Sequence, residues 1–261
     1  HLYIYKVDPD NGLVQHGYKN IHDNIVWQNG NAGVRNMEFS TTGDLFWFGE
    51  SNQIIKFDSS GVATDFWNGA LDFIWTNTGS KLQTGCVTDN YVWIITYSNY
   101  QSKNWIHAFK FDLSGGAPTQ VANINTNYNF QVRGAFGAGD KLYLVIQNYN
   151  TNLVDVYKID EEGSSMDLLH SFTPFTGTLL ASSYVAPSHM SYSNGYLYYR
   201  TDWGARADAV AYNLDRLNLT TFEVETKWSS STDVYGPGGV SGYVYYGSMA
   251  VDSGIMYFVS S

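Results

Sequence analysis

The sequence predicts an all-β protein made of five repeats of four antiparallel strands, in which the last repeat joins the two ends of the chain. The first observation is a four-residue phrase that alternates apolar and polar positions and ends in Asp. It occupies residues 5–8, 55–58, 109–112, 157–160 and 212–215. The second observation is the spacing. Successive aspartates lie 50, 54, 48 and 55 residues apart, and the step from Asp215 through the chain ends to Asp8 is 54, so the repeats predict a ring.

The phrase predicts the third strand of each repeat and the turn that follows it. Alternation of apolar and polar residues is typical of a half-buried strand. Four copies continue into a turn that runs from Asp to Gly, as from Asp58 to Gly61, and a fourth strand follows, so the two strands form a hairpin. In the fifth copy we expect Asp215 to Asn218 to form the turn, with Asn in the place of Gly.

Two more strands precede each phrase. An aromatic-rich strand follows a turn, as in residues 43–48, and a short run with small residues or Met comes before that turn, as in residues 37–39. Small side chains suit strands that are crowded around a central axis. No segment shows a helical period over ten residues. The repeats are expected at residues 36–66, 83–122, 132–172 and 188–227, with the fifth shared between 250–261 and 1–20.

With four strands in each of five repeats, the chain resembles the five-bladed β-propellers over essentially its whole length. The resemblance implies one domain over residues 1–261, with one blade built from both chain ends, which leaves no open sheet edge. It also implies that function gathers on the face that carries the long connections, because the opposite face holds only short turns. These motifs define blades and point to no particular family of propellers.

Composition narrows the class of partner. Aromatic residues make up 16% of the chain and charged residues 15%, and much of the polarity comes from Asn, Ser, Thr and Gly, which favours an extracellular or cell-surface protein. The formal charge of −10 argues against nucleic acid, because a polyanion is repelled. No apolar run approaches the roughly 20 residues of a membrane span, so no membrane insertion is expected. Cys86 is the only cysteine and is expected to be a small buried residue.

The long connections contain aromatic residues beside amides and carboxylates. An aromatic ring can stack on the C–H face of a sugar while the polar groups bind its hydroxyls. The candidate ligand-binding residues of these loops are Trp203, Arg206, Asp208, Trp27 and Trp75. The alternative is that such tryptophans pack between blades as core. The loop residues do not repeat as the strands do, so one or two irregular sites are expected rather than five equivalent ones.

Three cationic residues lie at or near equivalent places on the innermost strands: Arg35, Arg133 and His189. If they converge on a central channel, they could bind an anion such as a carboxylate or an acidic sugar. The alternative is that they pair with Glu38 or with backbone carbonyls and only fill the channel.

No catalytic residue is predicted. Propeller glycosidases use carboxylates on innermost strands, and here only Glu38 lies on such a strand, where its counterparts are Cys86 and Ala135. An acid and base pair cannot be formed from one carboxylate. No metal-ligand spacing occurs and no cofactor is expected, although calcium held by acidic loops stays open. The Asn218-Leu219-Thr220 sequon makes Asn218 a candidate glycosylation site.

The sequence therefore predicts a non-enzymatic, extracellular or surface module that binds carbohydrate through aromatic and Asn-rich loops on one face. Two alternatives stay open. One is a protein-interaction or structural module of an extracellular assembly, and the other is an enzyme that acts on glycans. The expected partner is accordingly a glycan or a protein surface.

Overall fold

The computed structural model describes most of the chain as β-strands and turns. The described residues are 2–8, 12–19, 34–49, 53–68, 81–100, 103–126, 130–148, 150–151, 153–173, 184–204, 211–229, 249–252 and 255–258. They include no helix, and so none that is long and apolar enough to cross a bilayer. The all-β prediction is confirmed for this part of the chain.

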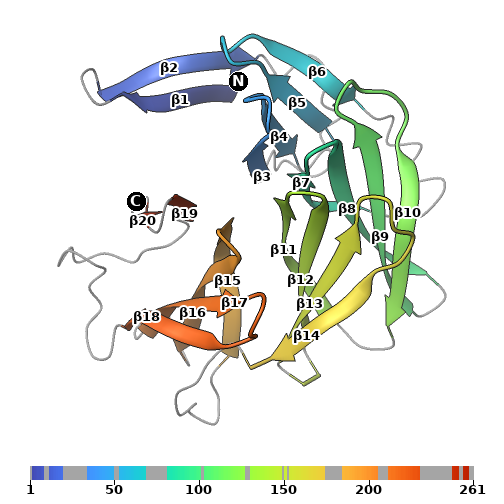
Figure 1. Ribbon diagram of the computed structural model, residues 1–261, viewed down its shortest axis with the longest axis vertical. Coiled ribbons are helices and arrows are strands. Elements are labelled where there is room, and N and C mark those ends of the chain that lie inside the picture. The colour runs from blue at the N-terminus through green and yellow to red at the C-terminus, as the bar shows by residue number, and fades with distance from the viewer. Residues whose placement is uncertain are drawn as a thin grey trace. The chain divides into compact units, whose positions relative to one another are not determined.

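Four antiparallel sheets of four strands follow one another along the chain, and each sheet keeps its strands in sequence order (Figure 1). This is the build of a β-propeller blade. Blade 1 contains β3 (Val34–Phe39), β4 (Leu45–Gly49), β5 (Gln53–Phe57) and β6 (Ala63–Asn68). Blade 2 contains β7 (Lys81–Val87), β8 (Tyr91–Tyr100), β9 (Lys103–Asp112) and β10 (Thr119–Thr126). Blade 3 contains β11 (Phe130–Ala138), β12 (Lys141–Asn148), β13 (Val154–Asp160) and β14 (Asp167–Phe172). Blade 4 contains β15 (Tyr184–Ser193), β16 (Tyr196–Gly204), β17 (Ala211–Asn218) and β18 (Val224–Ser229).

The remaining described strands form two separate hairpins. One pairs β1 (Leu2–Asp8) with β2 (Gly12–Lys19), and the other pairs β19 (Met249–Asp252) with β20 (Ile255–Phe258). The described strands thus contain four complete blades, and the count of five and the closure of the ring stay predictions.

The contacts divide the chain into two compact units. One consists of His1–Asn129, Ala135–Tyr143 and Lys158–Asp167, and the other of Phe130–Gly134, Leu144–Tyr157 and Leu168–Ser261. The single domain over residues 1–261 also stays a prediction.

The predicted turns from Asp to Gly are confirmed in blades 1 to 3. The Gly61 N–H donates to the Asp58 carbonyl at 2.9 Å, and the same bond closes residues 112–115 and 160–163. The Asp58 carboxylate also accepts the N–H groups of Ser60 and Val62. Gly61 has a φ of 86°, a conformation that glycine adopts without steric cost. These turns hold one end of each blade.

In blade 4 the predicted turn is wrong by three residues. Strand β17 continues through Asn218, which lies opposite Tyr196 as Asp112 lies opposite Tyr91 in blade 2. The Asn218 side chain accepts the N–H groups of Thr220 and Thr221, and Phe222 has the positive φ of 60°. The phrase of this blade is therefore 215–218, not 212–215, because the register aligns Arg216 with Lys110.

The cation of the phrase stacks on an aromatic ring in both blades, which confirms the register. The Lys110 ammonium lies 4.0 Å from the Tyr91 ring centroid, and the Arg216 guanidinium lies 4.1 Å from that of Tyr196. Such contacts are worth roughly 0.5–1 kcal/mol at exposed sites. In blades 2 and 4 this position thus holds a positive charge near an aromatic ring, whereas in blades 1 and 3 its lysine pairs with Asp44 or Asp160.

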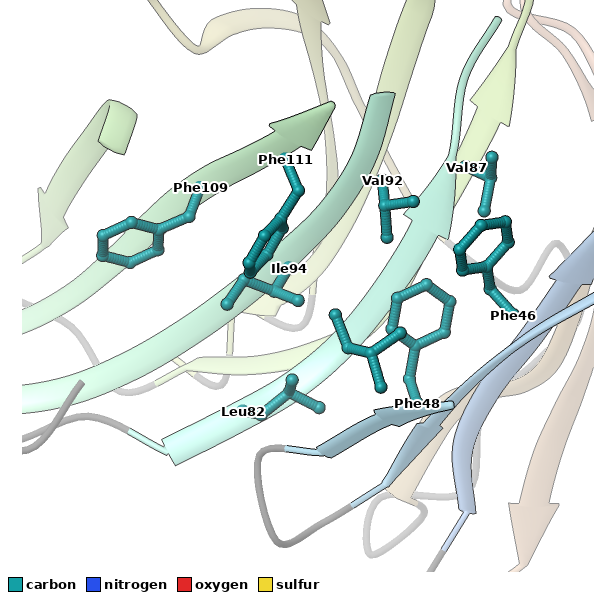
Figure 2. Close-up of a cluster of buried hydrophobic side chains, with 9 residues drawn as sticks. Phe46, Phe48, Leu82, Val87, Val92, Ile94, Phe109 and Phe111 are labelled. Carbon is teal, nitrogen blue, oxygen red and sulfur yellow. The ribbon is translucent and has the colours of Figure 1, made fainter. Parts of the chain in front are cut away.

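A core cluster lies between the faces of blades 1 and 2. Figure 2 shows Phe46 and Phe48 of β4 against side chains of blade 2, and this cluster consists of Phe46, Phe48, Ile54, Leu82, Val87, Val92, Ile94, Phe109 and Phe111. Phe66 meets the Phe46 ring edge to face at 5.0 Å. Full burial of a side chain of this size contributes about 1.5–3 kcal/mol, so the cluster stabilises this part of the chain strongly.

Candidate functional site at the innermost strands

Half of the predicted ligand-binding residues lie on strands, and the others lie outside the described part of the chain. Arg35 lies on β3, Arg133 on β11, His189 on β15 and Trp203 on β16. The residues outside the described ranges are Trp27, Trp75, Arg206 and Asp208. The ligand-binding role of all eight remains a prediction.

Trp203 lies on a strand, although the sequence predicts it in a long connection. Trp203 lies on β16, opposite Val185 of β15 and Ala211 of β17, so its backbone belongs to a central strand. The β-favouring run of Tyr, Thr and Trp residues extends the pairing to Gly204. Trp203 is therefore placed near the end of a strand rather than within a free loop.

The Arg133 side chain has a neutral partner on the next strand. Its Nε donates to Gln147 Oε1 at 2.9 Å, and its Nη2 donates to the same oxygen. Gln147 is buried on β12. The predicted convergence of Arg133 with Arg35 and His189 on an anion is still a prediction.

Glu38 bonds to backbone groups on two other innermost strands. Its Oε2 accepts the Val87 N–H at 2.8 Å, and its Oε1 accepts the Gly137 N–H at 3.2 Å. These donors lie 49 and 99 residues further along the chain, on β7 and β11. The sequence allowed an arginine as the partner of Glu38, but the observed partners are two backbone N–H groups.

Asn36 makes the complementary contacts from the same face of β3. Its Nδ2 donates to the Gly85 carbonyl at 2.6 Å and to the Ala135 carbonyl at 3.5 Å. The free edge of an innermost strand leaves such N–H and C=O groups without a ladder partner, and each buried one needs a hydrogen bond. Asn36 and Glu38 together therefore satisfy both kinds of edge group on β7 and β11.

The close approach of these strands depends on glycine. A Cβ on Gly137 would overlap the backbone carbonyl oxygen of Val87, and a Cβ on Gly85 would overlap the Phe48 ring. The Cys86 side chain is fully buried between these positions, as the sequence predicted. Its pKa is raised by burial first and by the nearby Glu38 charge second, so the thiol stays protonated.

Burial raises the pKa of Glu38 to about 8, although part of the side chain remains accessible to solvent. The hydrogen bonds from Val87 and Gly137 act in the opposite direction, because they favour the ionised form. The carboxyl group can therefore hold a proton near neutral pH. In register, its counterpart on β7 is Cys86, since Glu38 pairs with Phe46 as Cys86 pairs with Trp93. Among the described residues, no group of three His, Cys, Asp or Glu could hold a metal ion.

The candidate glycosylation site lies at the end of β17. Asn218 is partly exposed and its Oδ1 caps the turn through Thr220 and Thr221, while Thr220 is exposed. The sequon thus begins the turn between β17 and β18. Its modification stays a prediction.

No protein-family model matches the chain, and no curated protein matches it. Solved propeller structures are similar to it. The α-L-arabinanase of Penicillium chrysogenum with arabinobiose is 12% identical, with a TM-score of 0.48, over 74% of this chain and 66% of that one. The GH93 α-L-arabinofuranosidase of Fusarium graminearum with arabinobiose is 13% identical, with a TM-score of 0.44, over 69% and 62%. An oligogalacturonate lyase with manganese is 11% identical, with a TM-score of 0.44, over 87% and 59%. The chain spans less than two thirds of the length of each of these proteins.

Proposed function

We propose that this chain is a non-enzymatic module of the cell surface or extracellular space that binds carbohydrate. The binding residues are Trp203, Arg206, Asp208, Trp27, Trp75, Arg35, Arg133 and His189, at and beside the long connections. One end of the blades is held by tight, regular turns, and long connections on a regular scaffold are the usual carriers of binding residues. The aromatic and amide composition of those connections suits the C–H faces and hydroxyls of a sugar.

Binding rather than catalysis is supported by the hydrogen bonds that Glu38 accepts from two backbone N–H groups. A carboxylic acid with a pKa near 8 would suit a general acid, so Glu38 is the residue that an enzyme would use. However, both of its oxygens accept backbone N–H groups, and its counterpart on β7 is the thiol of Cys86. Glycoside hydrolysis needs a second carboxylate roughly 5–10 Å away. The position of Glu38 is better explained by its support of β7 and β11.

A glycan array tests the proposal directly. The wild-type chain is applied to neutral and acidic glycans with calcium and again with EDTA, because the role of calcium is open. We expect retention of a small set of related glycans, and at least a tenfold loss of affinity for Trp203→Ala. Phe39→Ala, which removes an exposed aromatic ring from β3, is the matched control and should bind as wild type does.

Two results would overturn this function. Retention of no glycan by the wild-type chain removes carbohydrate binding and leaves the protein-interaction module as the better account. Release of reducing sugar from a retained oligosaccharide, lost in Glu38→Gln, shows an enzyme instead.

A further inference from the structure

Three side chains share one face of blade 2 near the end where β8 passes into β9. Thr96 of β8 lies opposite His107 of β9, and Ser98 lies opposite Trp105, so Thr96, Trp105 and His107 are neighbours. We call these three residues the Trp105 site. It lies at the end of the blade away from the turn over residues 112–115. This is the end at which the long connections are found.

The rings of the Trp105 site are held in place. The Trp105 and His107 rings stack with centroids 6.1 Å apart and planes 8° apart. His107 Nδ1 lies 3.3 Å from Gln120 Nε2 of β10, and on the other face Tyr97 donates to Asn104 Oδ1 at 2.7 Å. The indole is thus stacked on a ring that is itself held by Gln120.

Two polar atoms of the Trp105 site have no hydrogen-bond partner and no contact with bulk solvent. They are the indole Nε1 of Trp105 and Oγ1 of Thr96, whose residue is fully buried. A buried polar atom without a partner costs about 1–3 kcal/mol. Native structures rarely retain such atoms unless a water molecule or a ligand satisfies them. Two of them beside a stacked pair of rings point to an oxygen that arrives from outside the chain.

The chemistry of the two atoms defines that oxygen. An indole N–H only donates, while a hydroxyl both donates and accepts, so one hydroxyl oxygen can accept from Trp105 and exchange a hydrogen bond with Thr96. Burial lowers the pKa of His107, which keeps the imidazole uncharged near neutral pH. The indole remains partly exposed and can pack against an apolar C–H surface beside the hydroxyl.

We propose that the Trp105 site binds a neutral sugar, with one ligand hydroxyl between Trp105 Nε1 and Thr96 Oγ1. This inference rests on the proposed function and names a site outside the residues proposed there. A side chain beside the indole must move for the oxygen to enter, since both atoms are buried. A single trapped water molecule could make the same two hydrogen bonds. Such a water would stabilise the fold but would not recognise a ligand.

The test compares Trp105→Phe and Thr96→Val with the wild-type chain, on the array glycan that the wild type retains. Thr96→Val removes the hydroxyl and keeps the side-chain shape, whereas Trp105→Phe removes the indole N–H together with part of the ring system. We expect binding about 5- to 30-fold weaker for each, as for loss of one neutral hydrogen bond. The matched control is Trp47→Phe, which removes another buried indole N–H without a partner, from β4, and should leave the affinity unchanged. Unfolding by urea confirms that all three fold.

Indole resonances provide a second measurement. In ¹⁵N-labelled protein, the Nε1–H signal absent from Trp105→Phe identifies Trp105, and this signal should shift when the glycan is added. Wild-type affinity in both variants, with no shift of the Trp105 signal, would overturn this site and leave the proposed function standing. A change in stability alone would show that the oxygen belongs to trapped water. Retention of no glycan by the wild type would overturn both proposals.

Discussion

Asp215 lies directly opposite Tyr199 in the ladder of β16 and β17, and both side chains are buried, with 2% and 0% of their surface exposed. The corresponding pairs are Ile55 with Trp47 in blade 1 and Phe109 with Ile94 in blade 2. Blade 4 thus places a carboxylate and a phenol where the other two blades have an apolar pair. Tyr199 also packs against Phe172 of β14, at 5.7 Å between ring centroids.

Removal of the Tyr199 hydroxyl should not destabilise the protein. The hydroxyl has no hydrogen-bond partner, and its pKa is raised by burial first and by Asp215 second, so it stays protonated. We expect Tyr199→Phe to raise the free energy of unfolding by about 1 kcal/mol, because an unsatisfied buried polar group is removed. Urea unfolding measures this. A loss of similar size would mean that a bound water satisfies the hydroxyl.

The free energy of unfolding should depend on pH through Glu38. Its folded-state pKa of about 8 lies above the ordinary 4.5, so the folded state keeps a proton that the unfolded chain loses. Stability is therefore highest below pH 4.5 as far as this group is concerned, and it falls as the pH rises to about 8. Glu38→Gln should flatten this part of the profile. The Gln side chain has only one acceptor oxygen, so its NH2 group must face one of the two backbone N–H groups. This lowers the free energy of unfolding by about 1–3 kcal/mol at low pH. Parallel profiles for the two proteins would rule out the raised pKa.

Gly137 should tolerate no side chain. Its substitution by Ala drives a Cβ into the Val87 carbonyl and disturbs the N–H that Glu38 accepts, so we expect a loss of at least about 3 kcal/mol. Gly43→Ala is the control. Gly43 has a φ of 84° and open space around it, so only backbone strain of about 1 kcal/mol is expected. Thermal unfolding of both variants decides the point, and equal losses would contradict the close approach of β7 and β11.

Two adjacent glutamates should differ widely in their contribution to stability. Glu161 is buried and accepts both the N–H and the side-chain Nδ2 of Asn90, at 3.0 and 2.8 Å. Glu162 is exposed and accepts a hydrogen bond from the Tyr91 hydroxyl at 3.1 Å. We expect Glu161→Ala to cost about 1–3 kcal/mol and Glu162→Ala less than about 0.5 kcal/mol. The comparison uses urea midpoints at constant salt. Similar midpoints would show that the Asn90 contact contributes little.

The blades could be predicted from sequence because their signals are local. A charge between two apolar positions, followed by Asp and a turn, recurs at nearly constant spacing, and it placed the third strand of blades 1 to 3 correctly. Blade 4 was misaligned because 212–215 resembles the other phrases more literally than 215–218 does. The strand pairing, which places Asn218 opposite Tyr196 and Arg216 opposite Tyr198, reveals the register, and that pairing is not encoded in the phrase.

The contacts of Glu38 could not be predicted for a different reason. Its partners are backbone N–H groups, which every residue other than proline has, so the identities of Val87 and Gly137 carry no signal. The sequence marked Glu38 as unusual by its place on an innermost strand. It could not show whether that carboxylate serves catalysis or the packing of strands. The Trp105 site was missed likewise, because Thr96 and His107 read as ordinary positions of two strands.

The Asn36 and Glu38 bonds have a consequence for how the chain folds. Backbone bonds within a blade join neighbouring strands, whereas the side chains of Asn36 and Glu38 bond to backbone groups 49 or 99 residues away. Contacts at such separations cost more loop-closure entropy and form later than local ones. The hairpins of each blade can therefore form early and independently of the other blades, as the repeats of a solenoid do. We expect the junction of β3 with β7 and β11 to form after the main folding barrier, so variants of Asn36 or Glu38 should act mainly on the unfolding rate.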